Sequence, residues 1–141
     1  ELCRKLIFEV TESVVAEDIN RVISVMNKLK ALGIRFSMDD FGTGFSSLSY
    51  LNRLPLDEIK IDREFIGALD QNEGDRLMVV TILNMAKTLK LNVVAEGVET
   101  AEPRDFLLRH DCHIFQGYLY SRPLPKAQFE AYCRSRDSDM R

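Results

Sequence analysis

The chain has 141 residues, of which 45% are hydrophobic and 29% are charged, a composition typical of one globular domain with its own core. A net charge of -3 and an isoelectric point near 5.4, with acidic and basic residues interspersed, exclude the basic surface that duplex nucleic acid requires. No apolar run approaches the roughly 20 residues of a membrane span, and no leader precedes the first predicted strand, so we expect a cytoplasmic domain, even if its parent protein is membrane-attached.

The hydrophobic pattern predicts strands and helices that alternate along the chain. Runs of β-branched and aromatic residues indicate strands, and apolar residues at helical spacing indicate amphipathic helices. The predicted strands are Leu6 to Thr11, Ile34 to Asp39, Glu58 to Asp62, Asn92 to Glu96 and His113 to Tyr118. The predicted helices are Asp18 to Leu32, Phe45 to Leu54, Asp75 to Leu91, Pro103 to about Arg109, and a last helix from Pro125.

This order of elements predicts an α/β fold built from βαβ units around a parallel sheet. Five such units fit either an open doubly wound sheet or part of a (βα)8 barrel, and the order of elements leaves both open. We expect one domain over residues 1–134, no ordered element before the first strand, and a frayed polar tail at residues 135–141.

Polar residues recur near the carboxyl ends of the predicted strands. Because successive strand residues point to opposite faces, Glu9 and Asp39 oppose bulky apolar neighbours. The same alternation applies to Lys60, and Glu96 and Gln116 stand at the ends of the last two strands. In a barrel these five groups would line a single mouth, which is where enzymes of that fold carry their active sites.

The adjacent residues Asp39 and Asp40, with Glu9 and Glu96, would make an oxygen-rich cluster. Hard divalent cations such as Mg²⁺ or Mn²⁺ take oxygen ligands, and two ions about 3.5–4 Å apart activate water for displacement at phosphorus. Lys60 would then orient the hydroxide or the phosphate oxygens, and Glu96 would bind metal or accept a proton from water.

Each of these residues also has a structural interpretation. Asp39 and Asp40 are of the type that forms turns and caps helices. Glu9 and Lys60 would make an ion pair inside a barrel, and Gln116 would satisfy backbone groups. The sequence leaves these alternatives open.

Three other features of the sequence are not expected to form a catalytic or metal site. Gly42-Thr43-Gly44 lacks the helix-opening pattern of a P-loop, so a mobile lid is expected there instead of a phosphate cradle. His110 and His113 lie at the amino end of the fifth strand, where a structural role is favoured over metal binding. The three cysteines are scattered and lack a C-x-x-C pair, which argues against a disulfide framework or a zinc site.

Five short strings, in a fixed order, resemble one known family. They are Phe8-Glu9-Val10-Thr11-Glu12, Asp39-Asp40-Phe41-Gly42-Thr43-Gly44, Lys60-Ile61-Asp62, Ala95-Glu96-Gly97-Val98-Glu99-Thr100 and Gln116-Gly117-Tyr118. Each string alone is weak evidence for membership of a family. Their order and spacing over nearly the whole chain resemble the EAL domain, the cyclic-di-GMP-specific phosphodiesterase family of bacterial signalling.

The resemblance implies a (βα)8 TIM-type barrel in which one strand runs against the others, truncated here to about the last five βα units. It implies hydrolysis of one phosphodiester of cyclic-di-GMP to linear pGpG, with two Mg²⁺ or Mn²⁺ ions as cofactors. It also implies a homodimer of the complete domain, and domains of this family commonly follow sensory or diguanylate-cyclase domains.

The resemblance carries residue roles over position by position. Glu9, Asp39 and Asp40 match metal ligands, with Asp39 as the bridge between the ions. Lys60 and Glu96 match the pair that positions and deprotonates the attacking water.

Three further positions belong to the same resemblance. Gln116 matches a polar residue of the catalytic site. Glu12 matches the glutamate that anchors the loop beginning at Asp39, a loop implicated in dimerisation and substrate binding. Glu99 belongs to the signature without a role that we can assign.

The resemblance also shows what the chain lacks. It begins at the strand that would be fourth, whereas a complete barrel needs about 250 residues. The preceding strands would carry the Glu-Ala-Leu motif, an asparagine ligand and an arginine, so we expect an inactive fragment with unpaired sheet edges. Two alternatives remain: a catalytically incompetent module that binds the nucleotide or a protein, and an enolase-like barrel in which Lys60 is a carbon base.

Overall fold

The computed structural model describes residues 1–43, 48–69 and 71–139. The strands are β1 (Ile7–Thr11), β2 (Arg35–Phe41), β3 (Glu58–Ile61), β4 (Asn92–Glu96) and β5 (Ile114–Gln116). The helices are the 3-10 helix η1 (Leu2–Lys5) and the α-helices α1 (Glu12–Glu17), α2 (Ile19–Lys30), α3 (Leu48–Leu51), α4 (Arg63–Gly67), α5 (Glu73–Thr88), α6 (Ala101–Arg109) and α7 (Lys126–Asp139).

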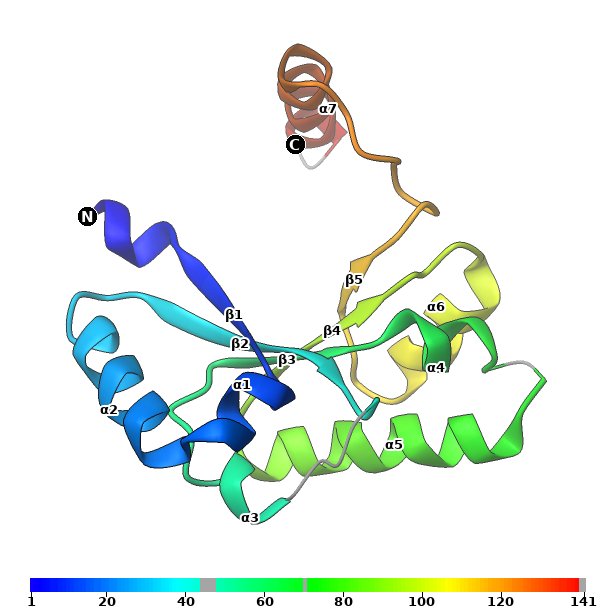
Figure 1. The fold of residues 1–141 in the computed structure, drawn as a ribbon. Helices are drawn as coiled ribbons and strands as arrows, with labels where there is room; N and C mark the ends of the chain where they lie inside the picture. The colour runs from blue at the N-terminus through cyan, green and yellow to red at the C-terminus, as the bar shows by residue number, and fades with distance from the viewer. Residues whose placement is uncertain (44–47, 70, 140–141) are drawn as a thin grey trace.

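The five strands form one parallel sheet in the order β1-β2-β3-β4-β5. Each strand therefore neighbours the next one along the chain, with helical connections between them (Figure 1). A doubly wound sheet reverses its strand order at a switch point, whereas a barrel adds strands in sequence. The order agrees with a section of a barrel and confirms the predicted α/β class, and the strand expected to run against the others is not among these five.

The core lies between the sheet and the helices that cover one of its faces (Figure 1). Phe36, Met38 and Ile59 are no more than 2% exposed and belong to one cluster with apolar residues of α2, α5 and α6. The alternating residues Ser37 and Lys60 are also buried. The packing thus follows the alternation expected from the sequence, with apolar side chains toward the helices and polar ones on the other face.

Capping residues explain where the long helices begin and end. The Asp18 carboxylate accepts the N–H of Arg21 at 3.1 Å at the start of α2, and Asn72 accepts the N–H of Gly74 at 2.9 Å at the start of α5. Gly33, with φ of 94°, follows the end of α2, where a left-handed residue stops a helix.

The structure differs from the sequence expectations at several elements. The helices η1, α1 and α4 were not expected, and η1 precedes the first strand, where no ordered element was predicted. Helix α7 extends to Asp139 and includes most of the segment expected to be frayed. Of the helix expected at 45–54, the described part is α3, and residues 45–47 lie outside the described residues.

Strand β1 lies at one edge of the sheet and pairs only with β2 within the described residues. Its neighbourhood exposes apolar side chains: Leu6, Ile7 and Phe8 are 39–41% exposed. At the other end of the chain, α7 stands apart from the helical layer (Figure 1). Among the described helices, none combines the length and apolar character needed to cross a membrane.

Candidate active site

Strand β2 is irregular where it reaches the carboxyl end of the sheet. Met38 and Phe41 pair with residues of β3 that are only two positions apart, so Asp39 and Asp40 together occupy the interval of a single β3 residue. Asp40 has φ of 52°, in the left-handed region that most residues avoid. A bulge of this kind re-aims side chains, and it allows adjacent carboxylates to share one side of the strand.

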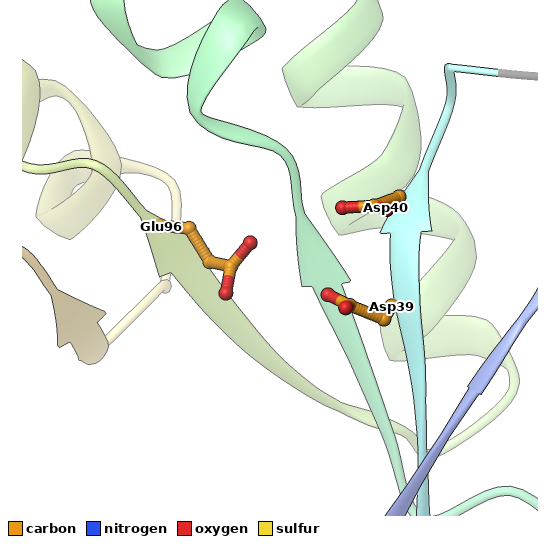
Figure 2. Close-up of side chains that lie close together, drawn as sticks. All are labelled: Asp39, Asp40 and Glu96. Carbon is orange, nitrogen blue, oxygen red and sulfur yellow. The ribbon is translucent and has the colours of Figure 1, made fainter.

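Asp39, Asp40 and Glu96 form a carboxylate cluster at this end of the sheet. One oxygen atom from each residue lies within 4.8 Å of the others. Figure 2 shows the aspartates of β2 and the glutamate of β4 directed into a common space across β3. Because β3 separates β2 from β4, the cluster depends on the bulge as well as on the strand order.

The ammonium group of Lys60 compensates part of the negative charge. Its Nζ atom lies 2.7 Å from Oε1 of Glu9, 2.7 Å from Oε1 of Glu96 and 3.8 Å from Oδ1 of Asp39. The lysine side chain is 9% exposed, whereas that of Glu9 is 50% exposed. The ion pair expected under the structural interpretation of Glu9 and Lys60 is therefore present, and Glu96 shares it.

The electrostatics of the site shift two pKa values. The negative charge of Asp39, followed by burial and the neighbouring Asp62 carboxyl, raises the pKa of Asp40 above its usual value. Burial alone lowers the pKa of Lys60, but hydrogen bonds to Glu9 and Glu96 and the nearby negative charges outweigh it and raise that pKa. Lys60 is therefore cationic at neutral pH.

The carboxylate cluster fits a hard divalent cation. Oδ1 of Asp39 is buried and accepts no hydrogen bond from the part of the chain that the structure describes, so an acceptor faces the cluster without a donor. A cation would satisfy that oxygen and relieve the repulsion that raises the pKa of Asp40. Oε1 of Glu9 accepts a hydrogen bond from Lys60, and Glu96 completes the group of three carboxylates, so a role of Glu9 as a metal ligand stays a prediction.

The remaining predicted site residues lie around the cluster. Gln116 pairs in register with Glu96 and lines a cavity of about 720 Å³ that also exposes Asp40 and Glu99. Glu12 lies outside this lining, and its Oε1 accepts the N–H of Gly42 at 3.4 Å, which ties the start of α1 to the turn after Asp40. The expected lid includes Gly44, which lies outside the described residues.

The sequence reasoning left several residues of this cavity unassigned. Asp62 follows β3, lines the cavity and caps α4 by accepting the N–H of Glu64 at 2.8 Å. Arg63 and Arg122 are the arginines among the lining residues. Asp62 was predicted as the last residue of the third strand, where alternation gives it the same face as Lys60, but it was assigned no role in the site.

Among the residues that the structure describes, His110 and His113 belong to no group of side chains with metal-ligand spacing. The His110 ring packs against Phe106 with ring centres 4.7 Å apart. Within residues 1–43, 48–69 and 71–139, the carboxylate cluster is the group of three or more His, Cys, Asp or Glu side chains with metal-ligand spacing. Burial raises the pKa of the Cys112 thiol, whose Sγ atom lies near backbone carbonyl oxygens of Val93 and Ile114.

A parallel sheet in barrel order, with a lysine and a carboxylate cluster at its mouth, defines a section of a TIM-type barrel with a candidate metal site. A family model described as "EAL domain" matches residues 1–123, and the chain belongs to this family.

The chain is similar to parts of larger known proteins. It is 47% identical over 127 residues to cyclic di-GMP phosphodiesterase NbdA of Pseudomonas aeruginosa, covering 90% of this chain and 16% of NbdA. It resembles the structure of the PaMucR phosphodiesterase in complex with c-di-GMP, with a TM-score of 0.86, 46% identity, and coverage of 90% of this chain and 51% of that chain.

A second solved structure is a manganese complex. The Klebsiella pneumoniae BlrP1 manganese/cy-diGMP complex at pH 6 matches with a TM-score of 0.79 and 35% identity, covering 85% of this chain and 31% of that one. The chain therefore spans about half of the PaMucR chain and less of the longer relatives.

Proposed function

We propose that a complete EAL domain containing this chain hydrolyses one phosphodiester bond of cyclic-di-GMP to give linear pGpG, and so lowers the level of a bacterial second messenger. The observation that carries the proposal is the carboxylate cluster Asp39, Asp40 and Glu96 beside the ammonium group of Lys60. Family membership and the c-di-GMP complex of the PaMucR structure support the choice of substrate.

The cofactors in this proposal are two Mg²⁺ or Mn²⁺ ions, which would lower the pKa of water and neutralise charge on the phosphate oxygens. Asp39 and Asp40 would hold them, with Glu9 as a further ligand at the edge of the site. The unsatisfied Oδ1 of Asp39 and the manganese complex of BlrP1 support a cation here.

The chain's own residues would move the proton and orient the reactants. Glu96 would accept a proton from the attacking water as the water oxygen bonds to phosphorus. The bond from phosphorus to the leaving ribose oxygen breaks, and that oxygen takes up a proton from the solvent. Lys60 stays cationic throughout and stabilises the charge that develops on the phosphate oxygens. Gln116 would contact the same phosphate from β5, and Glu12 would hold the turn at Gly42.

The position of Lys60 argues against an enolase-like reaction. A carbon base must be neutral to accept a proton, and Lys60 donates to two carboxylates at 2.7 Å. Hydrogen bonds of this kind stabilise the charged amine.

The proposal is tested with the complete domain, by measuring conversion of cyclic-di-GMP to pGpG. We expect Glu96→Ala and Lys60→Ala each to lower kcat by at least about 100-fold, because each removes proton transfer or charge stabilisation. EDTA should stop turnover, and Mg²⁺ or Mn²⁺ should restore it. The control is Glu58→Gln at the other end of β3, and wild-type turnover by Glu96→Ala or Lys60→Ala would refute the proposal.

One alternative is a regulatory module that binds the nucleotide or a protein without hydrolysis. It stays open because the chain spans 51% of the PaMucR chain, and the rest of that chain supplies residues to the complete domain. Tight binding of cyclic-di-GMP with no turnover by the wild-type complete domain would favour it. We further propose that the complete domain is cytoplasmic, forms a homodimer and follows a sensory or diguanylate-cyclase domain.

A further inference from the structure

The cavity beside the carboxylate cluster changes character along its lining. The part contributed by the ends of β2, β3 and β4 carries Asp40, Asp62 and Glu96. The part contributed by the segment after β5 and by α7 carries aromatic and apolar side chains: Tyr118, Pro123, Leu124, Phe129 and Tyr132. The acidic part could hold a metal ion and, through it, a phosphate, and the aromatic part could stack on a planar base. The cavity therefore suits a nucleotide.

Arg122 stands at the aromatic part of this cavity. Its guanidinium carbon lies 4.7 Å from the centre of the Tyr118 ring, and Tyr118 as a residue is 52% exposed. Within the described part of the chain, the guanidinium makes no hydrogen bond or ion pair, so its N–H donors are available to a ligand. Contact with the face of an aromatic ring limits the orientations of the planar guanidinium group. Less conformational entropy is therefore lost when the guanidinium binds a ligand.

The two parallel N–H donors of a guanidinium group favour guanine over adenine. Guanine offers two acceptors, O6 and N7, on one edge, which match two parallel N–H donors of an arginine, whereas adenine carries an amino donor in place of O6. We propose that Arg122, held on Tyr118, binds the O6/N7 edge of a guanine base of the nucleotide whose phosphate lies at the carboxylate cluster. This inference rests on the proposed function and adds the group that would distinguish guanine from adenine.

Arg63 provides a matched control because it lines the same cavity from another element. It is the first residue of α4, after β3, whereas Arg122 follows β5 on the far side of β4. A Cβ atom at Gly97 would overlap the Cβ of Arg63, so the Arg63 stem lies against the turn after Glu96. Arg63 contributes charge to the cavity, and within the described residues no aromatic ring lies under its guanidinium as the Tyr118 ring does under that of Arg122.

The experiment compares binding of cyclic-di-GMP and cyclic-di-AMP to the complete domain in EDTA, where neither is hydrolysed. We expect Arg122→Lys, which keeps the charge and loses the fork, to reduce the preference for cyclic-di-GMP about tenfold by weakening that nucleotide alone. Arg63→Lys should leave the ratio of the two dissociation constants unchanged. Circular dichroism melting should show both variants folded.

An unchanged ratio in Arg122→Lys, or an equal loss for both nucleotides, would overturn the inference. If the wild-type domain hydrolyses cyclic-di-GMP in Mg²⁺ and either result is found, the inference fails and the proposed function stands. If the wild-type domain neither binds nor hydrolyses cyclic-di-GMP, both fail.

Discussion

Lys60 is the residue on which carboxylates from three strands converge. Glu9 lies on β1, Asp39 on β2 and Glu96 on β4, and the lysine comes from the strand between the last two. Negative side chains so close together repel one another unless a cation lies between them. Lys60 is therefore needed for the stability of the metal-free sheet as well as for the proposed chemistry.

We predict that Lys60→Met lowers the free energy of unfolding by about 2 kcal/mol, less than for a fully buried pair because Glu9 is half exposed. Mg²⁺ or Mn²⁺ should stabilise this variant more than the wild type, because a bound cation replaces the lost charge. Urea unfolding with EDTA and with metal measures both effects. Lys87→Met, which removes an exposed pair, is the control, and equal metal stabilisation of Lys60→Met and wild type would contradict the prediction.

At the residue scale, alternation along the strands predicts the face of Lys60 but not the position of Asp40. Strict alternation sends Asp40 to the face opposite Asp39, and the bulge that reverses this depends on the pairing of β2 with β3. A register shift is a property of two strands together. It has no signature in either strand alone.

At the scale of elements, the turn after β4 is clamped to the end of β5. The Val98 N–H donates to the Gln116 carbonyl at 3.1 Å, and the Leu119 N–H donates to the Val98 carbonyl at 3.0 Å. Gly117 lies between these bonds, where a Cβ atom would overlap the backbone of Val98. The clamp holds Glu96 and Gln116 in register at the cavity.

We predict that Gly117→Ala destabilises the chain by about 3 kcal/mol, because the backbone of Val98 must move and its hydrogen bonds must break. Gly67→Ala in α4 is the control: an added Cβ meets nothing within 4 Å, so we expect a change between zero and a gain of about 1 kcal/mol. Thermal unfolding compares the two. Similar melting temperatures for both variants would show that the backbone of Val98 leaves room for a side chain at position 117.

A second junction joins α2 to the amino ends of the strands. The Asp57 carboxylate accepts the N–H of Phe36 at 2.9 Å and two hydrogen bonds from Nζ of Lys30 at 2.8 Å. Its carbonyl accepts the N–H of Asn92 at 3.0 Å, so one residue links α2, β2 and β4.

We predict that Asp57→Ala costs about 2 kcal/mol, because it leaves a part-buried N–H and an ammonium group without acceptors. Lys87→Ala, which breaks a pair whose side chains are 74% and 73% exposed, should cost less than about 0.5 kcal/mol. Chemical denaturation measures both. An Asp57→Ala effect as small as that of Lys87→Ala would contradict the role of this junction.

Element prediction succeeds where burial is periodic over many residues. Helices α2 and α5 have 12 and 16 residues, enough for an apolar stripe to repeat, and both were predicted. Helices α1 and α4 have six and five residues, too short for periodicity, and were missed. Both helices directly follow predicted strands, which end at Thr11 and Asp62, and the segments that form them were assigned to no element.

At the scale of the whole molecule, the strand order decides between an open doubly wound sheet and a section of a barrel, the two folds that the sequence left open. Consecutive parallel pairing without reversal belongs to a barrel, and the related PaMucR structure is matched over 51% of its length. A section of a barrel cannot close, so β1 keeps one side unpaired within the described residues. Leu6, Ile7 and Phe8 add exposed apolar surface there.

An unpaired edge strand with exposed apolar side chains is a template for pairing with another chain. We predict that residues 1–141 alone self-associate through β1, whereas a complete EAL domain, in which neighbouring strands cover this edge, does not associate by that route. Light scattering over a range of concentrations measures the mass. Ile7→Lys should reduce the association by placing a charge on the edge, and Leu77→Lys, at a 69% exposed position on α5, should not. A concentration-independent monomer of residues 1–141, or equal effects of the two lysines, would show that the β1 edge is not the associating surface.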